Sequence, residues 1–503
     1  MTASPAAKTK VVPLKQGNLA SMPEGVEIPG YDRGKLVCGI VHLGFGGFHR
    51  AHMARYTHEL MQKDFSANAA WAIAGAGLMP GDKKMQDALA PQDVLYTLVE
   101  REGTHEKASV IGSAAQIIFA GESSAELLAQ IEKPSTKIVS LTVTENGYCL
   151  NPVTKKLDPN HPVVAADLTN PQTPKSAIGI IVESYNRRMQ KGMKPFTALS
   201  CDNIQHNGNV LCEAVMAFAK LRDPKLAAWI EQNATFPNTM VDRITPVTKS
   251  EDIAYVEQSL GIADAWPVVC ESFTQWVIED KFVDGRPSWE NVGAQFVPDV
   301  EPYEVMKLRL LNASHLAVAC LGDLAGYTYI DETMANPLFK MYMRALMDRE
   351  TGQTLLPVPG IDLPAYKQKL VDRFANPAIK DTVQRVATDA PLNTVLASIK
   401  DRLKKEESID LLALALAAWL RRVRGGKDET GREIVVRHPL AVELQEKAVE
   451  GGANPAPLLA MTQLFGDLGK DPRVVEPVSK YLASIYSKGT LETMREASVA
   501  LGF

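Results

Sequence analysis

The sequence predicts an α/β protein, with a doubly wound parallel sheet first and a mostly α-helical part after it. Up to about residue 298, short apolar or β-branched runs alternate with helical patterns, as in sheets whose parallel strands are joined by helices. The first of these runs ends in a glycine-rich turn. Beyond residue 298, helix-like segments follow one another and strand-like runs are scarce. We therefore predict two domains, residues 1–297 and 298–503.

The elements follow from these patterns in chain order. The run LVCGIVHLG is almost wholly apolar, as expected for a parallel strand that is buried on both faces. A helix should follow over 50–63, where apolar residues recur at helical spacing. Further strands are expected over 71–77, 137–145 and 196–203. In the second part we predict helices over 306–324, 337–350 and 408–425, with a loop over 355–364.

Composition excludes several classes of protein. The 503 residues are 46% hydrophobic and 22% charged, which is enough apolar surface for sizeable cores. Lys plus Arg (54) nearly balances Asp plus Glu (59), so nucleic acid is not an expected partner. No apolar run is long enough to cross a membrane. The N-terminal residues lack the apolar core of a signal peptide and suggest a polar arm.

Six scattered cysteines show no CxxC pair, which disfavours a disulfide framework or a zinc site based on cysteine. Together these features predict a cytoplasmic protein.

The first predicted strand leads into Gly44-Phe45-Gly46-Gly47-Phe48, the start of a dinucleotide-binding GxGxxG motif. Gly44 permits a tight turn, and Gly46 lets the main chain approach a pyrophosphate at a helix N-terminus. His49 stands where the third glycine usually allows close packing between helix and strand, so we expect a modified crossing. The alternative is an ordinary glycine turn.

The acidic residue that usually binds the adenosine ribose should follow the second strand. The nearest carboxylate is Asp82, which would favour NAD by repelling the 2′-phosphate of NADP. Lys83 and Lys84 act in the opposite sense, so NADP stays possible. Asp82 could instead be a solvated turn residue.

A metal site formed by His49, His52 and His58 is the less favoured interpretation, because His52 and His58 would face different sides of a helix. We expect no metal.

Lys307, Asn312 and His315 fall within one predicted helix. At about 100° per residue they would point near 0°, 140° and 80°, on one side of an otherwise apolar helix. Polar groups in such a place need polar partners, which a cleft would supply. On spacing alone, a partly solvated polar face is the better explanation of the three residues.

Several longer segments resemble the mannitol dehydrogenase family, the polyol-specific long-chain dehydrogenases. They occur in the family's order between about residues 36 and 385. The segments are Gly44-Phe-Gly46-Gly47-Phe-His49-Arg50-Ala51-His52, Ser200-Cys-Asp202-Asn203 with His206-Asn207-Gly208, Phe236-Pro-Asn-Thr-Met-Val-Asp242-Arg243-Ile-Thr-Pro246, Gln275-Trp-Val-Ile-Glu-Asp-Lys-Phe282, Asp284-Gly-Arg-Pro287 and Lys307-x4-Asn312-x2-His315.

The resemblance implies a Rossmann-type N-terminal domain, an α-helical C-terminal domain, an active site in a cleft and no metal. It implies an NAD(P)-dependent enzyme that interconverts D-mannitol and D-fructose by hydride transfer at C2. The expected partner is a small polyol or ketose, and the expected state is a monomer or weak homo-oligomer. The resemblance leaves open a related polyol or sugar-acid dehydrogenase acting on sorbitol, D-arabinitol or hexuronate. A non-catalytic dinucleotide-binding protein is the alternative of another class.

Carried over to this sequence, the family's roles make Lys307 the general base, which requires burial or nearby positive charge to lower its pKa. Asn203 and Asn312 would form an oxyanion hole. His315 would position the substrate, and Glu304 could pass the proton to water. The residues implied to bind hydroxyl groups are Asp242 and Arg385.

Each role has a plainer alternative. Asn203 could cap the next helix, Asp242 could be the salt-bridge partner of Arg243, and Arg385 could lie on a helix surface. Glu304 could be a first-turn acid favoured by the helix dipole. The sequence also departs from the family at Asn393, where members usually have a lysine that we expect to contact substrate. Asn393 keeps hydrogen-bonding capacity without the charge, which leaves the exact polyol open.

Overall fold

The computed structural model describes residues 11–152 and 154–503, so the predicted polar arm lies largely outside the described residues. The chain divides into two units, one that ends at Val300 and one that starts at Glu301. No helix in the described part of the chain has the length and apolarity needed to cross a membrane. Each unit is described by itself below.

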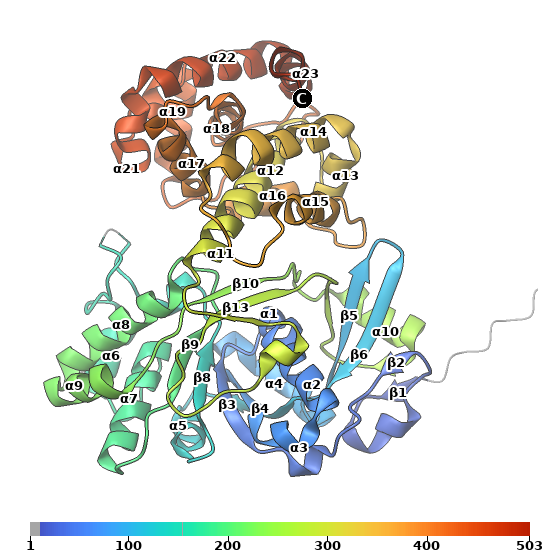
Figure 1. Ribbon diagram of the computed structural model, residues 1–503, viewed down its shortest axis with the longest axis vertical. Coiled ribbons are helices and arrows are strands. Elements are labelled where there is room, and N and C mark those ends of the chain that lie inside the picture. Colours follow the sequence, from blue (N-terminus) through green and yellow to red (C-terminus); the bar gives the residue numbers. More distant parts are fainter. Residues whose placement is uncertain (1–10, 153) are drawn as a thin grey trace, which may run out of the picture. The chain divides into compact units, whose positions relative to one another are not determined.

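The first unit is built on a five-stranded parallel sheet of strand order β7-β4-β3-β8-β9 (Figure 1). In chain order its strands are β3 (Cys38–Leu43), β4 (Ala72–Gly77), β7 (Ala114–Phe119), β8 (Ile138–Leu141) and β9 (Thr197–Ser200). Counted along the sheet this order is 3-2-1-4-5, the arrangement of the Rossmann fold. The direction of winding reverses between β3 and β8. In such sheets ligands bind at the carboxyl ends of the strands where that reversal occurs.

The strand predictions over 36–44, 71–77, 137–145 and 196–203 are confirmed as β3, β4, β8 and β9, with two of them too long. β8 stops at Leu141 and β9 at Ser200, so the residues after each strand form loops at the carboxyl edge.

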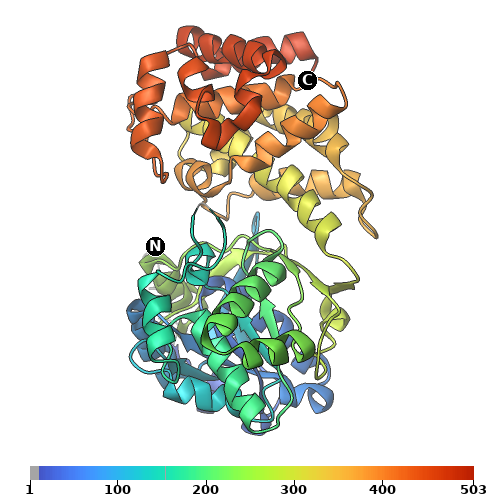
Figure 2. The same cartoon turned by 90° about the vertical axis from the view of Figure 1, so that its left-hand side faces the viewer.

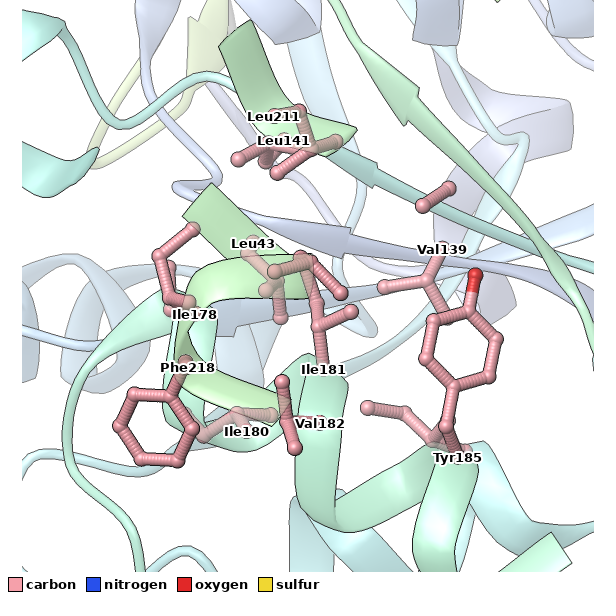
Figure 3. Packing of buried hydrophobic residues seen from close by; sticks show 14 of the residues in the cluster. Leu43, Val139, Leu141, Ile178, Ile180, Ile181, Val182, Tyr185, Leu211 and Phe218 are labelled. Atoms are coloured by element: carbon pink, nitrogen blue, oxygen red, sulfur yellow. The ribbon is translucent and has the colours of Figure 1, made fainter. Parts of the chain in front are cut away.

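Both faces of the central strand β3 are buried. Val41 and Leu43 belong to one hydrophobic cluster, and Ile40, directly before them, belongs to another. The first cluster packs β3 and β8 against α7 (Ala177–Gln190) and α8 (Asn207–Arg222), and Figure 3 shows Ile178 and Ile181 of α7 beside Leu43. This explains the continuous apolar run in the sequence.

The helix predicted over 50–63 is present, but it is interrupted, which the sequence did not predict. α1 (Gly47–Ala51) and α2 (Met53–Lys63) meet at His52, whose φ of −117° and ψ of −96° lie outside the helical region. The ring of His52 instead donates from Nε2 to the Gln275 carbonyl, 2.9 Å away.

Three smaller sheets were not predicted. β5 (Tyr96–Glu102) and β6 (His105–Ile111) form an antiparallel hairpin flanked by β12 (Val268–Glu271) and β2 (Val26–Glu27). β10 (Thr239–Asp242), β13 (Gln275–Glu279) and β14 (Gln295–Val297) form another sheet, and β1 (Val12–Pro13) pairs with β11 (Ile262–Ala263).

The second unit is helical, as predicted, and Figure 2 shows its helices from a second direction. α18 (Asp410–Arg422) is its central element: every residue from Leu411 to Leu420 is buried, and it packs on α12 (Ala313–Leu324) and α22 (Pro472–Lys488). The other longer helices are α14 (Pro337–Ala345), α15 (Leu363–Phe374), α16 (Val383–Asp389), α17 (Asn393–Lys404), α19 (Ala441–Gly451) and α23 (Thr490–Leu501).

Candidate functional site

The glycine turn after β3 has a conformation and a close contact that only glycine permits. Gly44 has a φ of +91°, and a Cβ atom there would lie 2.1 Å from the carbonyl oxygen of Thr142. The Thr142 hydroxyl donates to the Gly44 carbonyl at 2.9 Å. The turns after β3 and β8 are therefore in direct contact at the point where the winding of the sheet reverses.

A cavity of about 710 Å³ opens at this point, within the first unit. Its walls are the glycine turn, the segment after β4, the segment after β8 and the start of α7. Of the sequence-predicted cofactor residues, Gly44, Phe45, Gly46 and Asp82 line it. Gly47 and Phe48 are not among its lining residues, and the Phe48 ring stacks on His52 with centroids 4.9 Å apart.

Asp82 closes the turn after β4. One oxygen of its carboxylate accepts the main-chain N–H groups of Leu78 and Met79, each at 2.9 Å. Lys83 donates to Gln86 and Asp87 of its own helix, α4 (Lys83–Leu89). Asp82 is thus a structured turn residue on the cavity wall, and the Lys83 charge is already paired.

His49 occupies the space that a third glycine would leave empty. Its ring lies flat on that of His42 from β3, with centroids 3.4 Å apart and an angle of 18° between the planes. The His42 ring is fixed by Ser140 and Thr142, both at 2.8 Å. Two stacked imidazole rings therefore separate α1 from the sheet, which is the modified crossing that the sequence predicted.

The histidines of this region point in different directions. His58 bonds the Tyr31 hydroxyl at 2.8 Å, whereas His52 bonds the Gln275 carbonyl. Within the described residues, no group of three or more His, Cys, Asp or Glu side chains is arranged to hold a metal ion.

Burial lowers the pKa of His42, His52 and His58 to about 3 each, and also lowers that of His49. As the pH falls below about 6.5, the unfolded chain takes up protons that these buried rings refuse, so the free energy of unfolding should fall. Each such histidine should contribute about 1.4 kcal/mol per pH unit, down to the folded-state pKa. Urea unfolding at several pH values between 7 and 4 measures this slope.

Buried carboxyls with a raised pKa, such as Asp264, act in the opposite sense. The contribution of His52 is therefore the difference in pH slope of the free energy of unfolding between the parent and His52→Gln. The glutamine amide can keep the hydrogen bond to the Gln275 carbonyl. An identical slope in the two proteins would contradict the prediction. His105, exposed on β6, is the control position.

Asn203 and Asp242 both lie at or just beyond the ends of strands in the first unit. Asn203 is exposed in the loop between β9 and α8. The interpretation of Asn203 as a helix cap is wrong, because α8 starts at Asn207 and the capping position is His206. Asp242 is buried as the last residue of β10.

The guanidinium of Arg243 is held by other groups than Asp242. It donates to the Glu100 carboxylate, to the Ala51 carbonyl and, at 3.0 and 2.8 Å, to the Glu271 carbonyl. Arg243 therefore has several partners of its own, whichever group contacts Asp242.

The Lys307 segment differs from the ideal helix assumed for the sequence. α11 (Glu301–Met306) continues as a π-helix over Lys307–Asn312 before α12 begins. The prediction of 100° per residue across these positions is therefore wrong. Main-chain hydrogen bonds in a π-helix join residues five apart, so Asn312 stands one turn above Lys307, on the same side. Such turns are rare and occur frequently at functional sites.

Three polar residues of this segment, Glu304, Lys307 and Asn312, are buried at 6%, 7% and 7% exposure. The Oδ1 atom of Asn312 has no hydrogen-bond partner among the described residues. His315 follows on α12, half-buried, with its ring centroid 4.3 Å from that of Phe374. A buried lysine beside a buried amide suits proton transfer and hydrogen bonding to a polar ligand.

The other substrate residues implied by the resemblance lie in the second unit. Arg385 on α16 is exposed and pairs with Asp381 and Asp389, one turn before and after it. Asn393 is exposed at the start of α17. Within this unit, Arg385 thus lies on a helix surface, as the plainer alternative proposed.

Sequence reasoning missed three residues beside the cavity, Asp202, Thr144 and Tyr148. The Asp202 carboxylate accepts main-chain N–H groups of the loop after β8 and the Tyr148 hydroxyl. The only signal was the carboxylate directly before Asn203.

Comparison with known proteins gives matches along nearly the whole chain. The family model for the mannitol dehydrogenase Rossmann domain matches residues 38–291, and that for the mannitol dehydrogenase C-terminal domain matches 299–486. A mannitol 2-dehydrogenase of Aspergillus fumigatus is 43% identical over 479 residues, which cover 93% of this chain and 95% of that protein. One from Pyricularia oryzae is 42% identical over 484 residues, covering 94% and 96%.

Two solved structures are similar throughout. The ternary complex of Pseudomonas fluorescens mannitol 2-dehydrogenase with NAD and D-mannitol has a TM-score of 0.87 and 41% identity, covering 97% of this chain and 99% of that one. A D-sorbitol dehydrogenase in substrate-free form also has a TM-score of 0.87, with 33% identity and coverage of 96% and 100%.

Proposed function

Since this chain belongs to the mannitol dehydrogenase family, we propose that it interconverts D-mannitol and D-fructose with NAD as cofactor. The observation that carries this proposal is the similarity, over 97% of the chain, to a structure that contains both NAD and D-mannitol. The chain is accordingly an NAD-dependent polyol dehydrogenase with a Rossmann-type first domain and a helical second domain.

The cavity of the first unit fits a dinucleotide. The cavity has a volume of about 710 Å³ and lies where the winding of the sheet reverses. At this point the turn contains Gly44, a position where a Cβ atom would clash with the Thr142 carbonyl. The main chain at Gly44–Gly46 would hold the pyrophosphate, and the free oxygen of Asp82 would face the adenosine ribose. When bound, NAD supplies the hydride acceptor.

The reaction requires groups that move a proton and stabilise charge on oxygen. We propose that Lys307 takes the C2 hydroxyl proton in oxidation and returns it in reduction, with Glu304 passing it to water. The side-chain amides of Asn203 and Asn312 donate to the oxygen that carries the developing charge. His315, Asp242, Arg385 and Asn393 hold the substrate hydroxyl groups.

A related polyol or sugar-acid dehydrogenase is the second candidate, because Asn393 replaces the usual lysine and because the D-sorbitol dehydrogenase is similar throughout. Initial rates with D-mannitol, D-sorbitol, D-arabinitol, D-fructose and a hexuronate, followed by NADH absorbance, distinguish the candidates. We expect D-mannitol to exceed the other polyols in kcat/KM by about tenfold or more, because a misplaced hydroxyl leaves buried polar groups unpaired.

The same assay with NADP should give much lower activity, because Asp82 repels a 2′-phosphate and the Lys83 charge is paired. A higher rate with D-sorbitol than with D-mannitol would favour the second candidate function. Tight NADH binding without turnover of any substrate would favour a non-catalytic dinucleotide-binding protein.

We further propose a cytoplasmic location, which suits six cysteines that are all free thiols. A monomer or weak homo-oligomer is expected, and size-exclusion chromatography with light scattering measures it.

A further inference from the structure

The Asp202 carboxylate, one residue before Asn203, binds the loop after β8 that lines the cofactor cavity. It is buried at 5% exposure, two residues after the end of β9. One oxygen accepts the Thr144 N–H at 2.7 Å, and the other accepts the Val143 N–H at 3.2 Å and the Tyr148 hydroxyl at 2.9 Å. A single buried carboxylate therefore binds three donors of the loop that follows β8.

That loop contains a strained residue. Thr144 has a φ of 62° and a ψ of 170°, a region that is essentially restricted to glycine and is unusual for a β-branched residue. Such a conformation persists only where the surrounding structure imposes it, and it is concentrated at functional sites. The shortest bond of the Asp202 carboxylate to this loop is the one to the Thr144 N–H.

The loop is a wall of the cofactor cavity. Thr142, Val143 and Thr144 all line it, and Thr142 is the residue whose carbonyl touches the Gly44 position. Asp202 is thus connected to the glycine turn through two residues of main chain.

In the other direction Asp202 is fixed to its own loop. Its carbonyl accepts from the Asn207 side chain at 2.9 Å, and the same amide donates to Thr239 at the start of β10. The main chain directly before Asn203 is therefore held by hydrogen bonds to the loop after β8 and to Asn207.

We propose that Asp202 is a positioning residue that holds the strained loop of Thr144 against the cofactor cavity and fixes the main chain from which Asn203 projects. The proposal rests on the proposed function for the identity of the cofactor and for the role of Asn203. It assigns no proton transfer to Asp202, whose neighbours are hydrogen-bond donors.

The first test is Asp202→Asn, which keeps the shape but turns one acceptor into a donor that faces another donor. We expect the dissociation constant for NADH, measured by fluorescence titration, to rise by about tenfold or more. At saturating NAD, kcat for D-mannitol should fall as well, because Asn203 shifts with the loop.

Asp264→Asn is the matched control. Asp264 is also buried and accepts two main-chain N–H groups, those of Thr97 and Trp266, and one side-chain amide, none of them lining the cavity. It should lower the melting temperature and leave the NADH dissociation constant unchanged. Equal effects of the two variants on NADH binding would mean that Asp202 is merely structural.

The second test uses the strain itself. Glycine adopts the Thr144 conformation freely, so Thr144→Gly added to Asp202→Asn should restore part of the lost NADH affinity. Thr144→Gly alone should raise the melting temperature of the cofactor-free protein, which keeps the test decisive should Asp202→Asn fail to fold. Absence of rescue, or a lowered melting temperature, overturns the proposal. NADH titration requires no polyol turnover, so failure of the proposed function would be seen separately.

Discussion

Replacing Lys307 by alanine is expected to lower kcat for D-mannitol oxidation by at least about a hundredfold, the usual size of a general-base contribution. The dissociation constant for NADH should not change, because the cavity with the glycine turn lies wholly within the first unit. Stopped-flow measurement of NADH formation, combined with fluorescence titration of NADH, separates the two effects.

Lys307→Met is the companion variant, since it keeps a long apolar stem in a position that is 7% exposed. It should fold as well as the parent and be as inactive as Lys307→Ala. Lys340, on the exposed side of α14, is the control lysine, and its replacement should leave kcat as it is. Near-normal turnover of Lys307→Met would remove Lys307 from the mechanism.

Asn312→Asp should have an effect of similar size. The substitution is isosteric but replaces the amide donor by a negative charge, beside an oxygen that itself becomes negative during oxidation. Loss of one such donor costs about a hundredfold to a thousandfold in kcat. Steady-state kinetics with D-mannitol and with D-fructose should show the loss in both directions.

The control for the Asn312 prediction is a buried residue just beyond the π-helix. Ser314 is also buried, two residues further on in α12 and beyond the π-helical turn, so Ser314→Ala should change stability more than kcat. If Asn312→Asp lowered only the melting temperature, the amide would have a structural role and the oxyanion assignment would be wrong.

The sequence predicted the parts of the fold that depend on local pattern. The strand β3 is buried on both faces and therefore has a continuous apolar sequence, and Gly44 is required by a φ of +91°. The buried helix α18 was equally visible in its uninterrupted apolar run. The hairpin of β5 and β6 was missed although its signal was present, since Gly103 stands in the two-residue turn between the two strands.

Other features depend on contacts between distant segments. The role of Asp202 depends on residues 58 and 59 positions earlier in the chain. The π-helical turn at Lys307 changes the angular spacing on which the sequence argument relied, and no local pattern announced it. Family motifs named the residues Lys307, Asn312 and Asn203, but their mutual arrangement was beyond the reach of spacing alone.

The two N–H groups bound by Asp82 bear on any redesign of cofactor preference. An engineer who seeks NADP activity would first remove this carboxylate, yet the same atom terminates the turn after β4 by accepting from Leu78 and Met79. Truncation to alanine would remove the electrostatic repulsion but leave two main-chain N–H groups without an acceptor. Each such group costs about 1–3 kcal/mol where it is buried. Asparagine or serine, which retain an acceptor, are therefore better starting points for such engineering than alanine.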